Sequence, residues 1–137
     1  MSQHPHRLRR VRAFLQIASE ELEAARRLHV DLPRQATFFL QQTTEKLMRA
    51  VIEADDRVAG PTHNIAALTN LLAPDHELRA YFLEQDELSA AATSGRYPTS
   101  SGAIRVHDEP DELSLRIQQV EALFALVRAY LNKKHLG

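Results

Sequence analysis

The sequence predicts an all-α fold, an antiparallel up-and-down bundle of four to five helices. Prolines and glycines divide the 137 residues into long segments that are free of helix breakers. Within these segments apolar residues recur at steps of three and four, the spacing of one helical face. Apolar–polar alternation is confined to a few residues at 103–106. Because helices joined by short connections pack as antiparallel neighbours, we expect a single helical domain of residues 1–137 with a core at about 8–134.

The first half of the chain predicts two long helices and one short one. Apolar residues from Val11 to Leu28 follow one helical face, and a second helix is expected over about 34–58. A third, short helix begins near Asn64, with Thr62 as the expected cap.

The second half predicts two further helices separated by a long loop. One helix is expected from about 74 to 91, and the last begins after Pro110. Acidic residues follow Pro110 and two lysines end this helix, which suits the helix dipole at both ends. The loop between them, at about 94–110, is long for a small bundle, and such loops often carry function.

Composition excludes several classes of protein. There is no cysteine, which rules out disulfides, thiolate zinc sites and cysteine nucleophiles. No run of apolar residues is long enough for a membrane helix, and Met1 to Leu15 lacks the pattern of a signal peptide, so a cytoplasmic protein is expected. Adjacent side chains such as those at 107–109 rarely converge on one ion, and no glycine-rich phosphate loop is present. We expect neither a metal nor a cofactor.

The charge distribution gives a weaker signal. The net charge is −1, which argues against a protein that coats nucleic acid without regard to sequence. Residues 7–12 nevertheless carry four arginines and no acid. Such a block is usually a solvated face, and alternatively it meets phosphate or an acidic partner.

Two polar groups lie on or beside the second expected helix. Gln42, Glu45, Lys46 and Arg49 recur at helical spacing, which is typical of a solvated face and alternatively places an amide, a carboxylate and an ammonium on one wall of a groove. His63 follows at the entry of the short helix. A histidine there is commonly a cap, and alternatively it acts as a general acid or base near neutral pH.

The long loop holds a third polar fragment, Arg96-Tyr97-Pro98. It is interpreted either as a turn with a packed tyrosine or as a rigid support for a guanidinium that grips phosphate.

Together these fragments resemble the HEPN family, the higher eukaryote and prokaryote nucleotide-binding domains. The resemblance rests on the run Gln41 to Lys46 in a long helix that opens Ala36-Thr37-Phe38, then on residues 62–65 (THNI), then on residues 96–98 (RYP). The order and separations are similar to those of the family over about residues 8–134.

The resemblance implies a core of four or five helices, a homodimer and a polar groove near the helix junctions. It also implies that the chain is encoded beside a minimal nucleotidyltransferase, in a two-component module of the toxin–antitoxin type. Double phenylalanine at 38–39 supports a dimer independently, because one small bundle leaves part of such an apolar surface uncovered.

The first functional hypothesis is a binding module that receives a nucleotide or nucleic acid, or docks the nucleotidyltransferase. In it Lys46 and Arg96 hold phosphate or an acid, and Tyr97 is a stacking platform. The hydrogen-bonding residues are Gln42, Glu45 and His63.

The alternative is a metal-independent ribonuclease toxin. Many relatives cleave RNA with an Arg-x4–6-His motif, and Arg57 precedes His63 with five residues between them. In this hypothesis His63 is the acid or base, and Arg57 or Arg96 stabilises the transition state. A third interpretation is that the polar fragments only stabilise the bundle.

Overall fold

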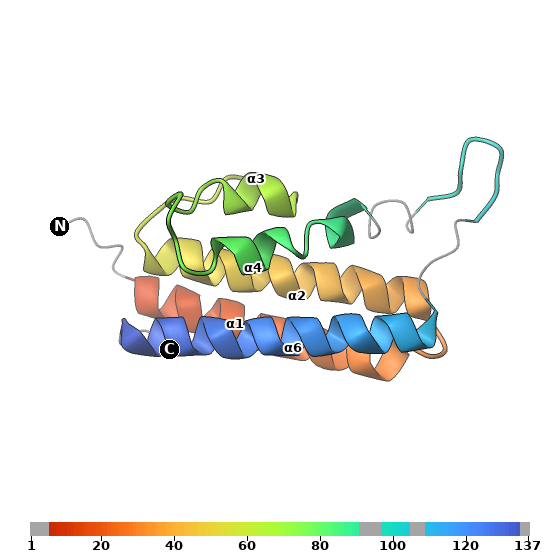
Figure 1. Ribbon diagram of the computed structural model, residues 1–137, viewed down its shortest axis with the longest axis horizontal. Coiled ribbons are helices and arrows are strands. Elements are labelled where there is room, and N and C mark those ends of the chain that lie inside the picture. Colours follow the sequence, from red (N-terminus) through yellow and green to blue (C-terminus); the bar gives the residue numbers. More distant parts are fainter. Residues whose placement is uncertain (1–5, 91–96, 105–108, 135–137) are drawn as a thin grey trace.

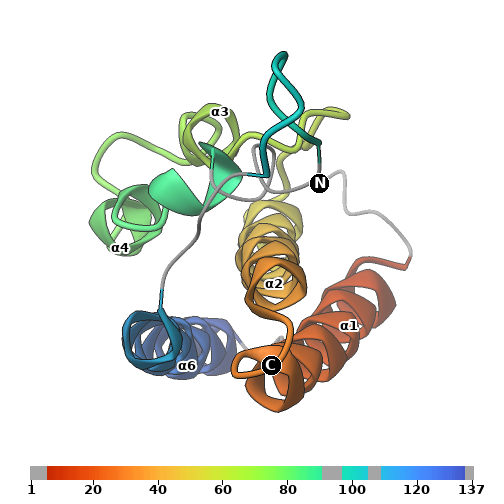
Figure 2. The same ribbon diagram turned by 90° about the vertical axis from the view of Figure 1, so that its right-hand side faces the viewer.

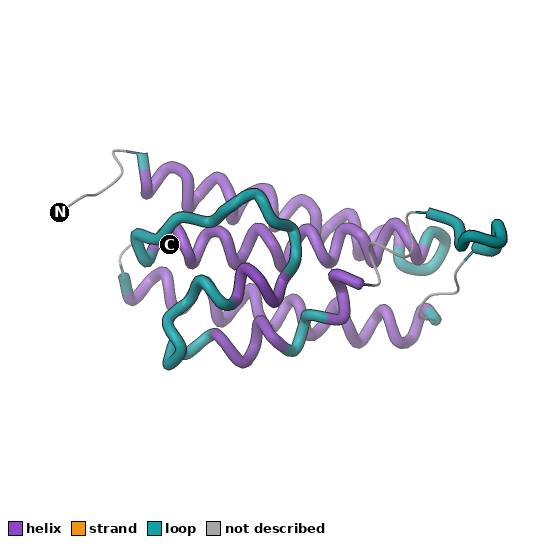
Figure 3. The backbone as a smooth tube through the Cα atoms, turned by 90° about the horizontal axis from the view of Figure 1, so that it is seen from above, coloured by secondary structure: helices purple, strands orange, loops and turns teal. Residues whose placement is uncertain are grey.

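Three long helices form the body of the molecule. The computed structural model describes residues 6–90, 97–104 and 109–134, and in it α1 (Arg7–Leu28), α2 (Pro33–Ala54) and α6 (Pro110–Lys133) lie side by side (Figure 1). α1 runs antiparallel to the other two. α2 and α6 run parallel, because the chain returns between them along the length of the bundle (Figure 1). The described residues contain helices and loops but no strand (Figure 3), so the all-α prediction is confirmed.

The returning segment consists of short helices. α3 (Ile65–Thr69) and α4 (Arg79–Leu83) lie on the side of α2 away from α1 (Figure 2), and residues 87–90 are also helical. A single helix over about 74–91 was expected, and this expectation is wrong. Asp86 Oδ1 accepts a hydrogen bond from Ala66 N, and Ser89 Oγ accepts one from Ile65 N. The segment bends because these side chains satisfy the unpaired N–H groups at the start of α3.

The cap of α3 also differs from the expectation. The side chain of Asn64 accepts a hydrogen bond from Ala67 N at 2.8 Å, so Asn64 is the capping residue. Thr62 instead accepts from the backbone N–H of Asn64 at 3.2 Å. Thr62 therefore shapes the turn that leads into the helix.

α2 is the centre of the core. Its side chains at Leu40, Leu47 and Met48 are fully buried, and they pack with Phe82 from α4 and Leu131 from α6 in one cluster. Three threonines of α2 are also buried, and each donates its hydroxyl hydrogen to the backbone carbonyl four residues earlier (Thr37, Thr43 and Thr44). α2 is thereby enclosed on nearly all sides, apart from one half-buried face.

The end of α2 determines the course of the linker of residues 55–64. Asp56 has a left-handed backbone with φ of 59°, and Arg57 N donates to Ile52 O while Asp56 N donates to Glu53 O. This pair of hydrogen bonds is a Schellman motif, which ends the helix and reverses the chain. The linker then runs back alongside α2 (Figure 3).

None of the helices in the described part of the chain is long and apolar enough to span a bilayer.

Candidate functional site

The half-buried face of α2 forms the floor of the candidate site. It lies between α1 and the linker of residues 55–64, and it exposes the ends of polar side chains at helical spacing (Gln42, Lys46, Arg49 and Glu53). Residues three and four apart on a helix lie on the same side. The predicted polar stripe therefore lies on one side of α2, between two other segments.

Glu45 anchors His63 in this site. The Glu45 side chain is only 3% exposed, whereas that of His63 is 75% exposed. His63 Nδ1 lies 3.0 Å from Glu45 Oε2 and 3.1 Å from Oε1. An ionised carboxylate only accepts hydrogen bonds, so the hydrogen of the neutral imidazole is on Nδ1 and Nε2 carries the free lone pair. A buried acid thus orients an exposed base.

Arg49 holds the backbone that carries the histidine. Its Nε donates to Glu45 Oε2 at 3.0 Å, and its two terminal nitrogens donate to the carbonyls of Gly60 at 3.1 Å and Thr62 at 2.7 Å. Gln41 Nε2 donates to the carbonyl of His63 itself at 3.0 Å. Side chains of α2 therefore fix the position of His63 at two places, its imidazole ring and the backbone around it.

Lys46 extends this network to α1. Its ammonium donates to Glu21 Oε1 at 3.2 Å and to Gln42 Oε1 at 3.0 Å. Gln42 Nε2 in turn donates to Gln41 Oε1 at 2.7 Å. Burial raises the pKa of the Glu21 carboxyl above its ordinary value, and the nearby Lys46 charge opposes that rise. A continuous chain of hydrogen bonds thus joins α1 to the linker.

The charges along this face are balanced. Three ion pairs lie along it: Lys46 with Glu21, Arg49 with Glu45, and Arg10 with Glu53. Each of these three cations has a carboxylate partner. The face is a site of directed hydrogen bonds, and it is not strongly basic.

This arrangement has two chemical capabilities. The His63 imidazole, held by a carboxylate on one nitrogen and open on the other, has the geometry of a general base or acid. The Lys46 and Gln42 head groups lie on the same face and are partly exposed, so they are suited to bind oxygen atoms of a ligand. Within the described ranges, no group of three or more His, Asp and Glu side chains is placed to hold a metal ion.

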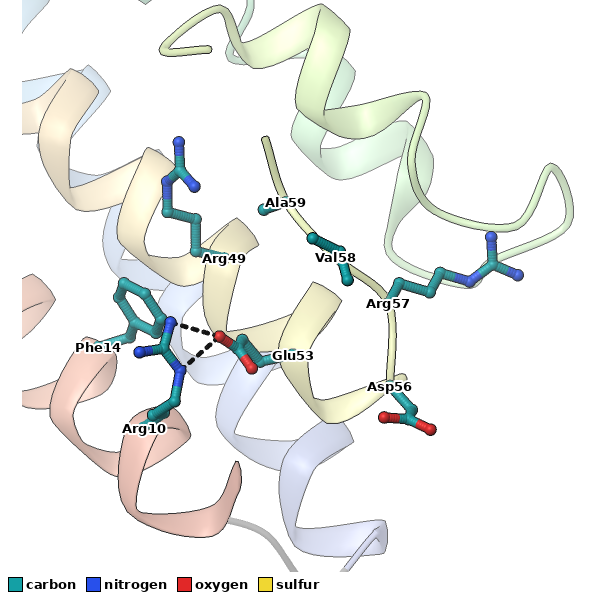
Figure 4. Close-up of a pocket in the computed structure, with 8 residues that line it drawn as sticks. All are labelled: Arg10, Phe14, Arg49, Glu53, Asp56, Arg57, Val58 and Ala59. Carbon is teal, nitrogen blue, oxygen red and sulfur yellow. Dashed lines mark hydrogen bonds and ion pairs between the residues drawn. The ribbon is translucent and has the colours of Figure 1, made fainter. Parts of the chain in front are cut away.

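Four of the predicted site residues come together in this network: Gln42, Glu45, Lys46 and His63. Arg57 does not join them. Its Nη1 donates to the carbonyl of Leu71 at 3.2 Å, and its side chain extends away from Arg49 (Figure 4). Tyr97 is 66% exposed on a segment beyond the N-terminal end of α2 (Figure 1). Arg96 lies outside the described residues.

Sequence reasoning missed three members of the network. Arg49 was placed in the polar stripe but not among the binding residues, and neither Gln41 nor Glu21 was selected. Gln41, Glu45 and Arg49 follow one another at steps of four, and this spacing was the available signal for Gln41 and Arg49. Glu21 belongs to another helix, and its contact with Lys46 depends on how α1 and α2 pack.

A second polar cluster surrounds Asp55, at the end of α2. Asp55 accepts from Tyr130 Oη at 2.5 Å and from His76 Nε2 at 2.9 Å, and it pairs with Lys134 at 3.1 Å. His76 Nδ1 accepts from Leu78 N, so both of its ring nitrogens are engaged. Burial and the hydrogen bond to Asp55 raise the pKa of the Tyr130 hydroxyl. With no open imidazole nitrogen, the cluster joins segments and is not an acid–base site.

Comparison with known proteins identifies the family. A family model described as the HEPN domain matches residues 11–134, which include most of α1, all of α2 and α6, the linker and His63. No curated protein and no solved structure matches the chain significantly. The match covers nearly the whole sequence, and the all-α bundle has the helix content that the resemblance implies. The chain therefore belongs to the HEPN domain family.

Proposed function

We propose that this protein is a nucleotide- or nucleic acid-binding module whose ligand contacts the half-buried face of α2. The observation that carries the proposal is the exposed His63 imidazole, held at 3.0 Å by buried Glu45 beside the Lys46 and Gln42 head groups. Imidazole, ammonium and amide groups all donate or accept hydrogen bonds with phosphate and sugar oxygens. Arg96 and Tyr97 of the predicted loop are proposed as further ligands.

The balanced charges predict how the ligand binds. Affinity that comes from many unpaired lysines and arginines falls steeply with salt, because each phosphate contact releases counterions. Here the cations are already paired, so binding depends on directed hydrogen bonds and changes little with salt.

In the cell we propose that the module acts in the cytoplasm as a homodimer. Its partner is a minimal nucleotidyltransferase, in a two-component system of the toxin–antitoxin type. Membership of the HEPN family supports this assignment. Light scattering of the purified chain tests the dimer, and calorimetry with a nucleotidyltransferase encoded beside it tests the partner. A monomer at micromolar concentration or an absence of heat would contradict the respective part.

A second candidate function is metal-independent cleavage of RNA, and the Glu45–His63 pair favours it. His63 Nε2 would take the proton of the ribose 2′-hydroxyl as its oxygen attacks the adjacent phosphorus, and the 5′-oxygen would leave as an alcohol after taking a proton from water. Glu45 stabilises the imidazolium that forms. Arg57 is bound to the Leu71 carbonyl, so it must change its contacts to stabilise the transition state.

One experiment separates the two functions. Purified protein is incubated with RNA in the presence of a chelator, and binding and cleavage are both measured. His63→Ala is compared with His29→Ala, whose ring contacts only the local Arg26 carbonyl at the end of α1. The binding module predicts that RNA stays intact and that His63→Ala alone weakens binding. Cleavage that is lost in His63→Ala would establish the nuclease, and equal binding by both variants would remove His63 from the site.

A further inference from the structure

A pocket adjoins the His63 site along α2. It lies between α1, the C-terminal half of α2 and the linker, and it has a volume of about 260 Å³ (Figure 4). Arg49 lines this pocket and also binds Glu45, so one side chain is shared by the pocket and the candidate site. The step of four residues from Glu45 to Arg49 corresponds to a rise of about 6 Å along α2. The pocket and the Glu45–His63 pair are therefore about one helical turn apart on α2.

The pocket combines an apolar surface with a polar edge. Phe14 and Ala59 are half-buried on opposite walls, and Val58 is 87% exposed on the linker (Figure 4). The Arg10 guanidinium lies 5.6 Å from the centroid of the Phe14 ring, and Val58 offers an exposed aliphatic surface that a planar ligand can contact. The volume lies slightly below the range of about 300–1,000 Å³ that is common for drug-sized ligands. It suits a single heteroaromatic base.

The polar edge offers a donor beside an acceptor. Arg10 Nε and Nη2 both contact Glu53 Oε1, at 2.7 and 2.6 Å. Among the described residues, neither Glu53 Oε2 nor Arg10 Nη1 takes part in this contact, so a carboxylate lone pair and a guanidinium N–H lie next to each other. This is the alternation that the edge of a nucleobase presents, with amino groups beside ring nitrogens or carbonyl oxygens.

We propose that this pocket binds the nucleobase of the ligand, with Val58 against one face and the Arg10–Glu53 pair at its edge. The inference rests on the proposed function and adds to it the part of the nucleotide that the protein recognises. His63 and Lys46 then contact the sugar–phosphate portion. The base supplies apolar contact and edge recognition, which the charge-balanced face by itself lacks.

The test compares ribonucleoside 5′-monophosphates with ribose 5-phosphate, which has no base, by calorimetry on the full chain. The wild type is expected to bind at least one nucleotide about tenfold more tightly than ribose 5-phosphate, in line with the contribution of base contacts elsewhere. Val58→Ser is expected to remove most of that difference and to leave the affinity for ribose 5-phosphate unchanged. Val30→Ser is the matched control, since Val30 is an exposed valine outside the pocket.

The edge is tested separately with Glu53→Gln, which exchanges the carboxylate acceptor for an amide. This change is expected to alter the ranking of the four nucleotides. Circular dichroism confirms that each variant keeps the helical content of the wild type. Equal affinity for nucleotides and ribose 5-phosphate, with His63→Ala still weakening both, would overturn the base pocket and leave the proposed function standing. Absence of binding by every compound would overturn both.

Discussion

Replacement of Arg49 by methionine tests whether Arg49 and Glu45 form a buried ion pair or belong to a solvated helix face. The side chains of Arg49 and Glu45 are 14% and 3% exposed. Removing one member of a buried pair leaves the other charge without compensation, at a cost of about 3–5 kcal/mol. His63 still contacts Glu45 at 3.0 Å, which places the expected loss near the lower end of that range.

The two backbone hydrogen bonds of Arg49 add little to this loss. The carbonyls of Gly60 and Thr62 lie in half-buried residues, so water replaces the lost donors. We expect Arg49→Met to lower the free energy of unfolding by about 3 kcal/mol and the melting temperature by roughly 10 °C for a domain of this size. Because the linker is no longer held, ligand binding at His63 should also weaken.

The assay is urea unfolding at neutral pH, followed by far-ultraviolet circular dichroism. The matched control is Arg27→Met, which breaks the exposed Arg27–Glu23 pair on α1 and is expected to leave stability at the wild-type level. In the double variant Glu45→Gln with Arg49→Met, both charges are gone and most of the loss should be recovered. If Arg49→Met is as stable as Arg27→Met, the burial argument is wrong.

Two further predictions concern pH. The pKa of Tyr130 is raised in the folded state, so the unfolded chain releases this proton first, from about pH 10. The stability that Tyr130 contributes is therefore lost as the pH rises beyond that value. In denaturant unfolding, Tyr130→Phe should cost about 1–2 kcal/mol at pH 7 through the lost bond to Asp55, and progressively less at alkaline pH. Lys46→Met removes the positive charge that keeps the pKa of Glu21 from rising further. The variant should therefore be about 1–2 kcal/mol less stable than the wild type at neutral pH. The two proteins should be equally stable near pH 4, where the Glu21 carboxyl is protonated. A pH-independent difference in either variant would contradict the assignment.

The long helices could be predicted from the sequence because their information is local. Apolar spacing marks α1, α2 and α6, and Pro33 and Pro110 stand at the first turns of the latter two. The returning segment could not be predicted in the same way. Its bend places the Asp86 and Ser89 side chains where they accept hydrogen bonds from the first backbone N–H groups of α3. These contacts join residues twenty or more positions apart, so the sequence carries no periodic signal of them.

In the candidate site, too, local features could be predicted from the sequence and long-range contacts could not. Gln42, Glu45 and Lys46 share one side of α2, which helical spacing alone predicts. That Glu45 is buried beneath His63 follows from the path of the linker, and Asp56 determines this path by its left-handed backbone. The same reversal separates Arg57 from His63, although their spacing in sequence suggests a pair.

The junction at Asp55 has a consequence for local motion. Helix ends ordinarily fray, since their last backbone groups lack partners. Here one carboxylate receives contacts from a loop histidine, from Tyr130 of α6 and from Lys134 just after α6, so the last turn of α2 opens only when all three contacts break. Amide hydrogens in that turn should exchange with solvent as slowly as those in the middle of α2.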